Sequence, residues 1–293
     1  MRRAGRTFTM IALAVCGAFP LFSQTPKDDK PVAEAPKLIV LSYQDIEPKK
    51  ADERDRLAVS MARTCDRLNT PNFWIDLQPL SGPKKVSSLD LFESFDQLEQ
   101  ARTGWNAALN AHPELARSQE QIQGTVSSEK KIFAIRRDDL GYLTDAADLS
   151  KSRYVRIDEI RLLPGHENDF AEAIRILKDG FTNLNAEAPW LVYQVSAGAP
   201  MPTFLVLMPM SVLKENDDLL AWEAKLPEST NDGDIDRLIQ VAREGYFSTE
   251  SHLYAISPEM SHVSKEFASG DTGFWKRSSS ANPGGADSKS GTR

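Results

Sequence analysis

Apolar positions change their spacing in the same succession twice along the chain. Each succession opens with a continuous apolar stretch, Leu38 to Ile46 and then Tyr154 to Leu162, whose β-branched and large side chains favour a strand. Helical spacing follows in both, with the apolar residues Leu57, Met61, Cys65 and Leu68 first, and Phe170, Ile174, Leu177, Phe181 and Leu184 later. We therefore expect one amphipathic helix after each opening strand.

The rest of each succession predicts a hairpin, a second helical region and a closing strand. Loops that contain Gly and Pro separate the hairpin strands, which are Phe73 to Leu80 with Leu89 to Phe92, and Trp190 to Ser196 with Phe204 to Met208. The second helical regions carry Trp105 and Trp222, and the closing strands are Ile132 to Arg136 and Leu253 to Ser257. Both successions thus have the order βαββαβ. Beyond them, Ser257 before Pro258 resembles a helix start and predicts a short terminal helix.

The chain also repeats residue types at equal intervals, which indicates an internal duplication. An offset of 116 positions places Pro48 on Pro164 and, without a gap, Leu68-Asn69 on Leu184-Asn185, Trp74 on Trp190, Gln78 on Gln194 and Gly82 on Gly198. After a few inserted residues, Ile132 falls on Leu253 and Ala134 on Ala255. We expect a first repeat over residues 37–145 and a second, with the terminal helix, over 146–277.

The order βαββαβ is that of the ferredoxin-like fold, and two copies in one chain resemble the dimeric α+β barrel superfamily. That superfamily includes NIPSNAP-like and antibiotic-biosynthesis-monooxygenase-like proteins. The resemblance implies an α+β fold in which the two repeats pack sheet to sheet and close one barrel within the chain. It therefore also implies a monomer that is an internal pseudo-dimer.

The composition of each end of the chain indicates that neither end belongs to the folded core. Arg2, Arg3 and Arg6 precede the apolar run from Met10 to Val15, which predicts a signal peptide over residues 1–23. A lipid anchor at Cys16 is disfavoured, because Val15 stands where a small residue is expected. Residues 24–36 and 278–293 are polar and predict a disordered linker and tail. We expect a secreted or periplasmic protein without a membrane span once the signal is removed.

Charge and side-chain chemistry exclude several classes of function. The formal net charge is −7, without a stripe of Lys and Arg, so we expect no nucleic-acid partner. No cluster of His, Cys and carboxylates has the spacing of a metal site, and no nucleophile or phosphate-loop motif is present. The superfamily resemblance implies that haem is possible, but only His252 of the four histidines begins a predicted strand, and we expect no cofactor. Cys65 lies on the apolar stripe of its helix, which predicts a structural role.

Strand alternation gives the candidate ligand site. We assign the plainer apolar faces of the strands, with Ile75, Leu77, Leu191 and Val155, to the helices. The opposite faces would then line a cavity between the two sheets with Trp74, Asp76, Gln78, Tyr154, Arg156, Asp158, Trp190 and Gln194. Aromatic walls with a few polar groups are typical of small-molecule sites. In the other interpretation, these side chains only fill the interior and satisfy one another.

Two functions remain open at this point. The first is a protein that binds a small organic molecule, or an accessory protein without catalysis. The alternative, which the resemblance suggests, is a cofactor-independent monooxygenase-like enzyme that acts on a small organic substrate. The sequence names no catalytic residue for it.

Overall fold

The strands of this protein pair with one another until the sheet closes on itself. The structure is a computed structural model that describes residues 35–82 and 85–277. The predicted signal peptide, residues 24–34 of the predicted linker and the tail 278–293 lie outside these residues. All described residues belong to one structural unit. Among them, no helix is both long enough and apolar enough to cross a bilayer.

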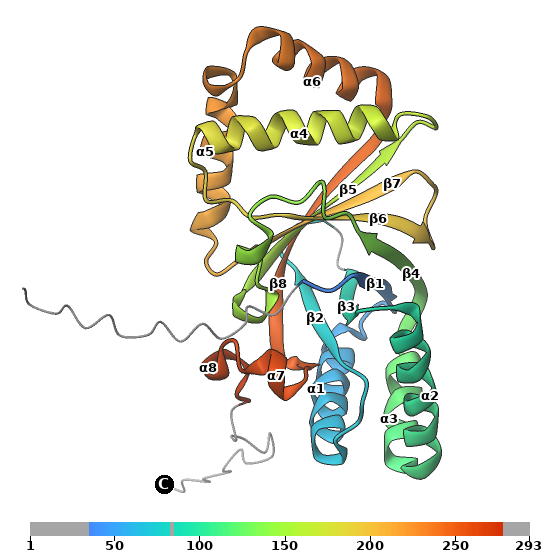
Figure 1. Ribbon diagram of the computed structural model, residues 1–293. Coiled ribbons are helices and arrows are strands. Elements are labelled where there is room, and N and C mark those ends of the chain that lie inside the picture. The colour runs from blue at the N-terminus through green and yellow to red at the C-terminus, as the bar shows by residue number, and fades with distance from the viewer. Residues whose placement is uncertain (1–34, 83–84, 278–293) are drawn as a thin grey trace, which may run out of the picture. The chain divides into compact units, whose positions relative to one another are not determined.

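Both halves of the chain contain strands and helices in the same order (Figure 1). The first half consists of β1 (Leu38–Ile46), α1 (Ala51–Leu68), β2 (Trp74–Pro79), β3 (Lys85–Phe92), α2 (Phe95–Ala111), α3 (Pro113–Gln123) and β4 (Val126–Arg136). Two short 3-10 helices, Thr144–Ala146 and Leu149–Lys151, connect it to the second half. The second half consists of β5 (Tyr154–Leu162), α4 (Glu167–Asn183), β6 (Leu191–Ala197), β7 (Thr203–Met210), α5 (Lys214–Ser229), α6 (Asp232–Gly245) and β8 (Tyr246–His262). The predicted second helical region is a pair of helices in each half.

The eight strands of the described residues form a closed antiparallel barrel in the order β1-β3-β2-β8-β5-β7-β6-β4. Within this order, the strands of each half are neighbours of one another. The halves join at two seams, where β2 pairs with β8 and β4 pairs with β6. The predicted α+β class, with a barrel that closes within one chain, is confirmed.

The side chains on the plain apolar face of each strand point into the interior of the barrel. Its core consists of Ile39, Leu41, Ile75, Leu77, Leu89, Ile132, Ala134, Val155, Ile157, Leu191, Tyr193, Val195, Leu205, Leu207, Tyr254 and Ile256. Successive side chains of a strand point to opposite faces, so the residues between these positions point outward, toward the helices. Both sheet faces are therefore covered, one by the rest of the barrel and the other by helices.

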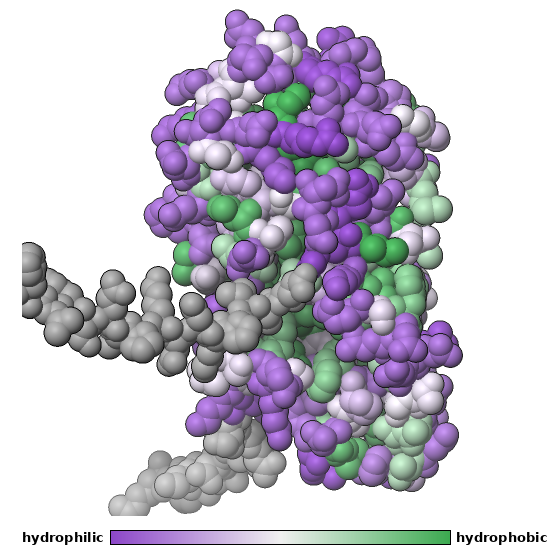
Figure 2. Space-filling view, in the orientation of Figure 1, coloured by the Kyte–Doolittle hydropathy of each residue, from purple (hydrophilic) through white to green (hydrophobic). Residues whose placement is uncertain are grey.

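The helices of the two halves cover the outer face of the barrel to different degrees. In the second half, α4 brings Phe170, Ile174 and Phe181 against outward side chains of β6 and β7 such as Val192 and Phe204. The far side of this helical layer is hydrophilic, as the region of α4 and α6 shows in Figure 2. In the first half, the buried hydrophobic cluster of the helical layer is smaller and consists of Met61, Cys65 and Leu115, and α1 also buries the small side chains of Ala58 and Ala62. Helix α2 has no buried residue. The first half consequently keeps an open space between its helices and the barrel.

The C-terminal region differs from the prediction in one respect. The predicted helix start at Ser257 is wrong, because β8 continues as a strand through His262. Hydrogen bonds to β2 extend this strand, with Trp74 paired to His262 and Asp76 to Ser257. The terminal helices α7 (Lys265–Ala268) and α8 (Thr272–Trp275) follow later. They bring Trp275 against the barrel core, and the Trp275 indole donates a hydrogen bond to the Ser150 carbonyl.

Candidate functional site

The predicted cavity between the two sheets is wrong, because the strand faces are the reverse of those expected. Ile75, Leu77, Leu191 and Val155 point into the barrel and not toward the helices. The eight residues that were expected to line the cavity consequently point outward. The physical reason is that the closed barrel encloses one face of every strand. The barrel interior offers polar side chains few partners, whereas the helices and loops outside supply donors and acceptors.

The first-half residues of the predicted site form a buried polar cluster beneath α1. The carboxylate of Asp76 is paired with the guanidinium of Arg54 in α1, with 2.9 Å between Oδ2 and Nη2. The Gln78 amide donates a hydrogen bond to the same carboxylate. The Trp74 indole donates to the carbonyl of Met260 at 2.8 Å. The structure therefore does bring these three side chains together, but against protein groups.

The second-half residues of the predicted site also have protein partners. Trp190 is buried, donates to the Leu140 carbonyl and stacks against Tyr142, with ring centroids 4.7 Å apart. The Gln194 amide oxygen accepts a hydrogen bond from Arg137 at 2.9 Å.

The remaining three predicted residues lie along β5. The guanidinium of Arg156 donates hydrogen bonds to both carboxylate oxygens of Asp158. Tyr154 lies two residues before Arg156, on the same face of the strand. A ligand-binding role for the eight predicted residues stays a prediction.

The open space in the first half is a pocket of about 450 Å³ between the barrel and α1, α2 and α3, which we call the lateral pocket. It is lined by Gln44, Met61, Trp105, Gln119, Ile122, Gln123, Val126, Ser127, Ser128, Glu129 and Lys131. These residues come from β1 and β4 of the barrel and from all three helices of the first half. Two residues, Gly124 and Thr125, join α3 to β4 at the edge of the pocket.

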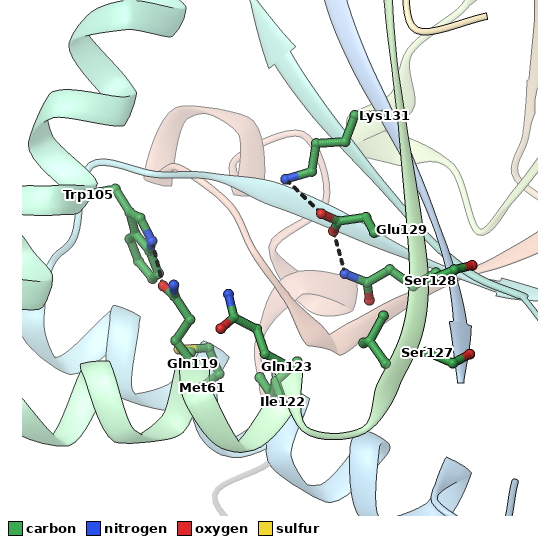
Figure 3. Close-up of a pocket in the computed structure, with 11 residues that line it drawn as sticks. Met61, Trp105, Gln119, Ile122, Gln123, Ser127, Ser128, Glu129 and Lys131 are labelled. Carbon is green, nitrogen blue, oxygen red and sulfur yellow. Dashed lines mark hydrogen bonds and ion pairs between the residues drawn. The ribbon is translucent and has the colours of Figure 1, made fainter. Parts of the chain in front are cut away.

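One wall of the lateral pocket is formed by helical side chains. The Trp105 indole of α2 donates a hydrogen bond to the Gln119 amide oxygen of α3 at 2.8 Å, which fixes the plane of the ring (Figure 3). Met61 and Ile122 supply apolar surface beside it. The Gln123 side chain projects into the space between this wall and Glu129 in Figure 3. Its amide is exposed, and the described residues offer it no hydrogen bond.

The opposite wall is polar and belongs to the barrel. The carboxylate of Glu129 lies between Lys131, at 3.4 Å, and the Gln44 amide, which donates to it at 2.8 Å (Figure 3). Both charged side chains are partly exposed, so the ion pair is hydrated and contributes little to stability. It is, however, held at the edge of a rigid strand pair. The wall can therefore present a carboxylate, an ammonium and an amide to one bound molecule.

A further carboxylate lies next to this polar wall. Asp90 of β3 is paired across the sheet with Val40, so its side chain points outward on the same face as Lys131 and Glu129. Burial raises the pKa of Asp90 to about 7; the Lys131 ammonium opposes the shift and the Glu129 carboxylate adds to it. A carboxyl group that titrates near neutral pH can accept or donate a proton under ordinary conditions.

Sequence reasoning missed both Asp90 and the lateral pocket. Asp90 alternates with Leu89 and Leu91 in an ordinary half-polar strand, and only the helical cover above it changes its chemistry. In the sequence, Trp105 only marks the second helical region. The available signal was the presence of three glutamines in α3 and of Trp105 in α2, but their position relative to β4 depends on the packing of the helices.

The histidines of the described residues do not fit a haem site in the lateral pocket. None lines it. His262 is buried, with Nδ1 2.6 Å from a carboxylate oxygen of Asp66. His166 contacts Asp169, His112 is the N-cap residue before α3, and His252 lies at the end of the barrel. The described residues also contain no group of three His, Cys or acidic side chains that could hold a metal ion.

Comparison with known proteins gives structural likenesses only. The chain matches no protein-family model and no curated protein sequence. A structure of an anthrone oxidase-like protein has a TM-score of 0.48 and 10% identity, over 76% of this chain and 92% of that one. A haem-binding protein from Thermus thermophilus has a TM-score of 0.43 and 12% identity, over 76% and 92%. A mutant chlorite dismutase from Candidatus Nitrospira defluvii has a TM-score of 0.46 and 9% identity, over 83% and 98%.

Proposed function

We propose that this protein binds a small amphipathic organic molecule in the lateral pocket. The observation that carries the proposal is the pair of unlike walls, with the ring of Trp105 on one side and the polar group of Gln44, Glu129 and Lys131 on the other. A volume of about 450 Å³ is in the range of small-molecule sites. An aromatic ring held by Gln119 offers a flat apolar surface, and the polar wall gives the ligand its orientation.

The proposal also explains the difference between the halves. We infer that the chain is a tandem duplication of two ferredoxin-like units, because both halves have the same element order and contribute four strands each to the barrel. In the second unit, large side chains such as Phe181 and Trp190 fill the space beneath α4. In the first unit, the equivalent positions hold Cys65 and Trp74, which belong to a smaller buried cluster, and the lateral pocket lies elsewhere in the same helical layer. One unit would thus stabilise the barrel while the other holds the ligand.

The test of binding uses 8-anilinonaphthalene-1-sulfonate, a fluorescent amphipathic probe. We expect one probe to bind each wild-type chain, and the Trp105→Ala variant to lose at least about tenfold in affinity, because an anchoring aromatic ring contributes on the order of 2 kcal/mol. Trp222→Ala is the matched control, since Trp222 packs in the helical layer of the second half. Equal binding by both variants would refute the lateral pocket as the site.

Asp90 lies behind the lining of the pocket, on the same sheet face as Lys131, and it suggests a second candidate, an enzyme that removes a proton from a bound organic substrate. A cofactor-independent monooxygenase-like reaction would need such a base, and a carboxyl group with a pKa of about 7 is suited to the task. The Asp90→Asn variant separates the two candidates. An enzyme would keep its affinity for a substrate and lose turnover, whereas a binding protein would show no turnover with either form.

Export and oligomeric state belong to the same proposal. We propose that residues 1–23 direct the protein out of the cytoplasm and are removed, which sequencing of the mature N-terminus would test. We also propose that the mature chain is a monomer, because both seams of the barrel are closed by its own strands.

A further inference from the structure

At one end of the barrel, several inward positions are charged, whereas the rest of the interior is apolar. Tyr43 of β1 is paired with Lys130 of β4, and Glu159 of β5 is paired with Glu250 of β8. Paired residues of antiparallel strands lie on the same sheet face. Tyr43 and Tyr254 pack against the interior core, so this face is the inner one.

These side chains surround a second cavity of about 330 Å³, which we call the barrel-mouth cavity. Its charged lining residues are Asp45, Lys85, Glu129, Lys130, Glu159 and Glu250. Four carboxylates thus face two ammonium groups, and His252 beside Glu250 adds a positive charge only when it is protonated. The excess of negative charge favours a cationic ligand.

Tyr43 and Tyr254 line this cavity with their phenol rings, and Ser87 lies beside the Tyr254 hydroxyl. The Tyr43 and Ser87 hydroxyls are buried and make no hydrogen bond of ordinary geometry with the described residues, and Ser87 is only 1% exposed. Both lie close enough to the Tyr254 hydroxyl to lower its pKa, which burial raises. Burial is also the main reason that the pKa of Tyr43 is raised, so its phenol keeps the proton. A polar molecule in the cavity can add a well-aligned hydrogen bond at the Tyr43 hydroxyl, which lines it.

An ammonium group of the chain itself already occupies part of the cavity. The Lys130 Nζ lies 5.8 Å from the centroid of the Tyr43 ring and 3.7 Å from a carboxylate oxygen of Glu159. An aromatic face next to a carboxylate is a favourable environment for an organic cation. Lys130 is partly exposed, so its side chain can leave this position without a large loss of packing.

We propose that the barrel-mouth cavity binds a small aliphatic amine, whose ammonium group takes the place of the Lys130 ammonium between Tyr43 and Glu159. A second ammonium group of a diamine would reach Glu250, whose only close partner in the described residues is His252. A divalent metal ion is a poorer occupant, because the described residues provide no group of three suitable ligands. The barrel-mouth cavity adjoins the lateral pocket, because Ser128 and Glu129 line both. The proposed ammonium position between Tyr43 and Glu159 lies on the inner face of the sheet, and the proposal does not depend on the function proposed for the lateral pocket.

Isothermal titration calorimetry with 1,4-diaminobutane tests the proposal, with 1,4-butanediol as its uncharged counterpart. We expect the diamine to bind and the diol not to bind. Because Lys130 competes for the same position, Lys130→Gln should bind the diamine about five- to tenfold more tightly than the wild type. Glu250→Gln should weaken binding about fivefold or more.

Two control variants test whether the diamine binds in the barrel-mouth cavity and not elsewhere. Lys214→Gln removes an ammonium from an exposed ion pair on α5 and should leave the affinity unchanged. Trp105→Ala, in the lateral pocket, should also leave it unchanged. All variants are first shown to be folded by thermal unfolding. Absence of diamine binding by both the wild type and Lys130→Gln would overturn the proposal, as would equal affinities for the diol and the diamine.

Discussion

Arg54 and Asp76 form an ion pair that the barrel and helix α1 bury almost completely, with their side chains 7% and 1% exposed. Burial raises the pKa of Asp76, and the Arg54 guanidinium is the main group that opposes the shift. Removal of one partner from such a pair leaves a buried charge without compensation. We expect Arg54→Met to lower the free energy of unfolding by about 3–5 kcal/mol.

Urea unfolding measures this loss. Lys214→Met is the control, since it breaks an exposed pair with Asp218 and should cost less than about 1 kcal/mol. The double variant Arg54→Met with Asp76→Leu should recover much of the stability, because no lone charge remains. Similar losses for Arg54→Met and Lys214→Met would contradict the burial of the pair.

Asp90 should make the stability of the protein depend on pH. Its pKa is about 7 in the folded protein and about 3.9 in an unfolded chain, so the folded state binds more protons between these values. Its contribution to stability is therefore complete below about pH 4, decreases as the pH rises and is lost above about pH 7.

Asp90→Asn removes this dependence and should stabilise the protein at pH 8 by on the order of 1–3 kcal/mol, since one pKa unit corresponds to about 1.4 kcal/mol. At pH 4, where the carboxyl group is protonated, the variant and the wild type should be nearly equal. Urea unfolding at both pH values provides the measurement. A variant that is stabilised equally at both would show that Asp90 does not titrate in this range.

Cys65 should be inert and structural. It is fully buried between α1 and α3, and burial raises its pKa to about 11, so the reactive thiolate is rare at neutral pH. We expect a thiol reagent to label the native protein only as fast as it unfolds. Cys65→Ala should cost about 1–2 kcal/mol, less than truncation of a buried Leu. Labelling within seconds in the native state would show that the site is open.

The hairpin glycines of the two halves should differ in their tolerance of a side chain. Gly82 and Gly198 have φ of +75° and +88°, which disfavours any other residue. A Cβ at Gly198 would also lie 1.8 Å from the Lys131 carbonyl oxygen, whereas at Gly82 the nearest atom is His252 Nδ1 at 3.4 Å. We expect Gly82→Ala to cost about 1 kcal/mol and Gly198→Ala clearly more. Thermal unfolding of the two variants would reveal the order, and a reversed order would count against the close approach of the two backbones.

The separate halves should not fold as monomers. The interior core of the barrel combines residues of both halves, for example Leu77 with Ile256 across one seam and Ala134 with Val195 across the other. We expect residues 37–145 or 146–277 expressed alone to aggregate or to self-associate through the exposed sheet, and the whole chain to be monomeric in light scattering. A half that is soluble and monomeric would show that the seams are dispensable.

The elements were predictable from sequence because each depends on a local period. The opening strands Leu38–Ile46 and Tyr154–Leu162 agree with the prediction residue for residue. The closing strands were placed correctly but too short, because their first halves are polar and exposed. In these first halves, charged residues such as Lys130 and Glu250 interrupt the alternation of apolar and polar side chains, so the hydrophobic pattern does not reveal a strand there.

The faces of the strands were not predictable in the same way. Alternation divides a strand into two faces, but it does not say which face the barrel encloses. The repeat alignment also slipped by one residue in the closing strand. It placed Ala134 on Ala255, whereas in the structure Ala134 and Tyr254 are the interior residues. Strand pairing matches Val126 to Ile46 and Tyr246 to Leu162, which gives an offset of 120 positions and not 121. A slip of one residue reverses the face of every side chain in a strand.

Strand β8 completes the barrel, and it is the last strand in the chain. Its partner β2 lies about 180 residues earlier, so a growing polypeptide exposes the edge of β2 until nearly all of the chain has been made. Synthesis at about 5–20 residues per second keeps that edge unpaired for at least ten seconds or so. Contacts this distant in sequence also form slowly once the chain is complete. The nascent protein thus has a long interval in which its apolar strands are open to other chains, and helper proteins that bind extended segments would act in that interval.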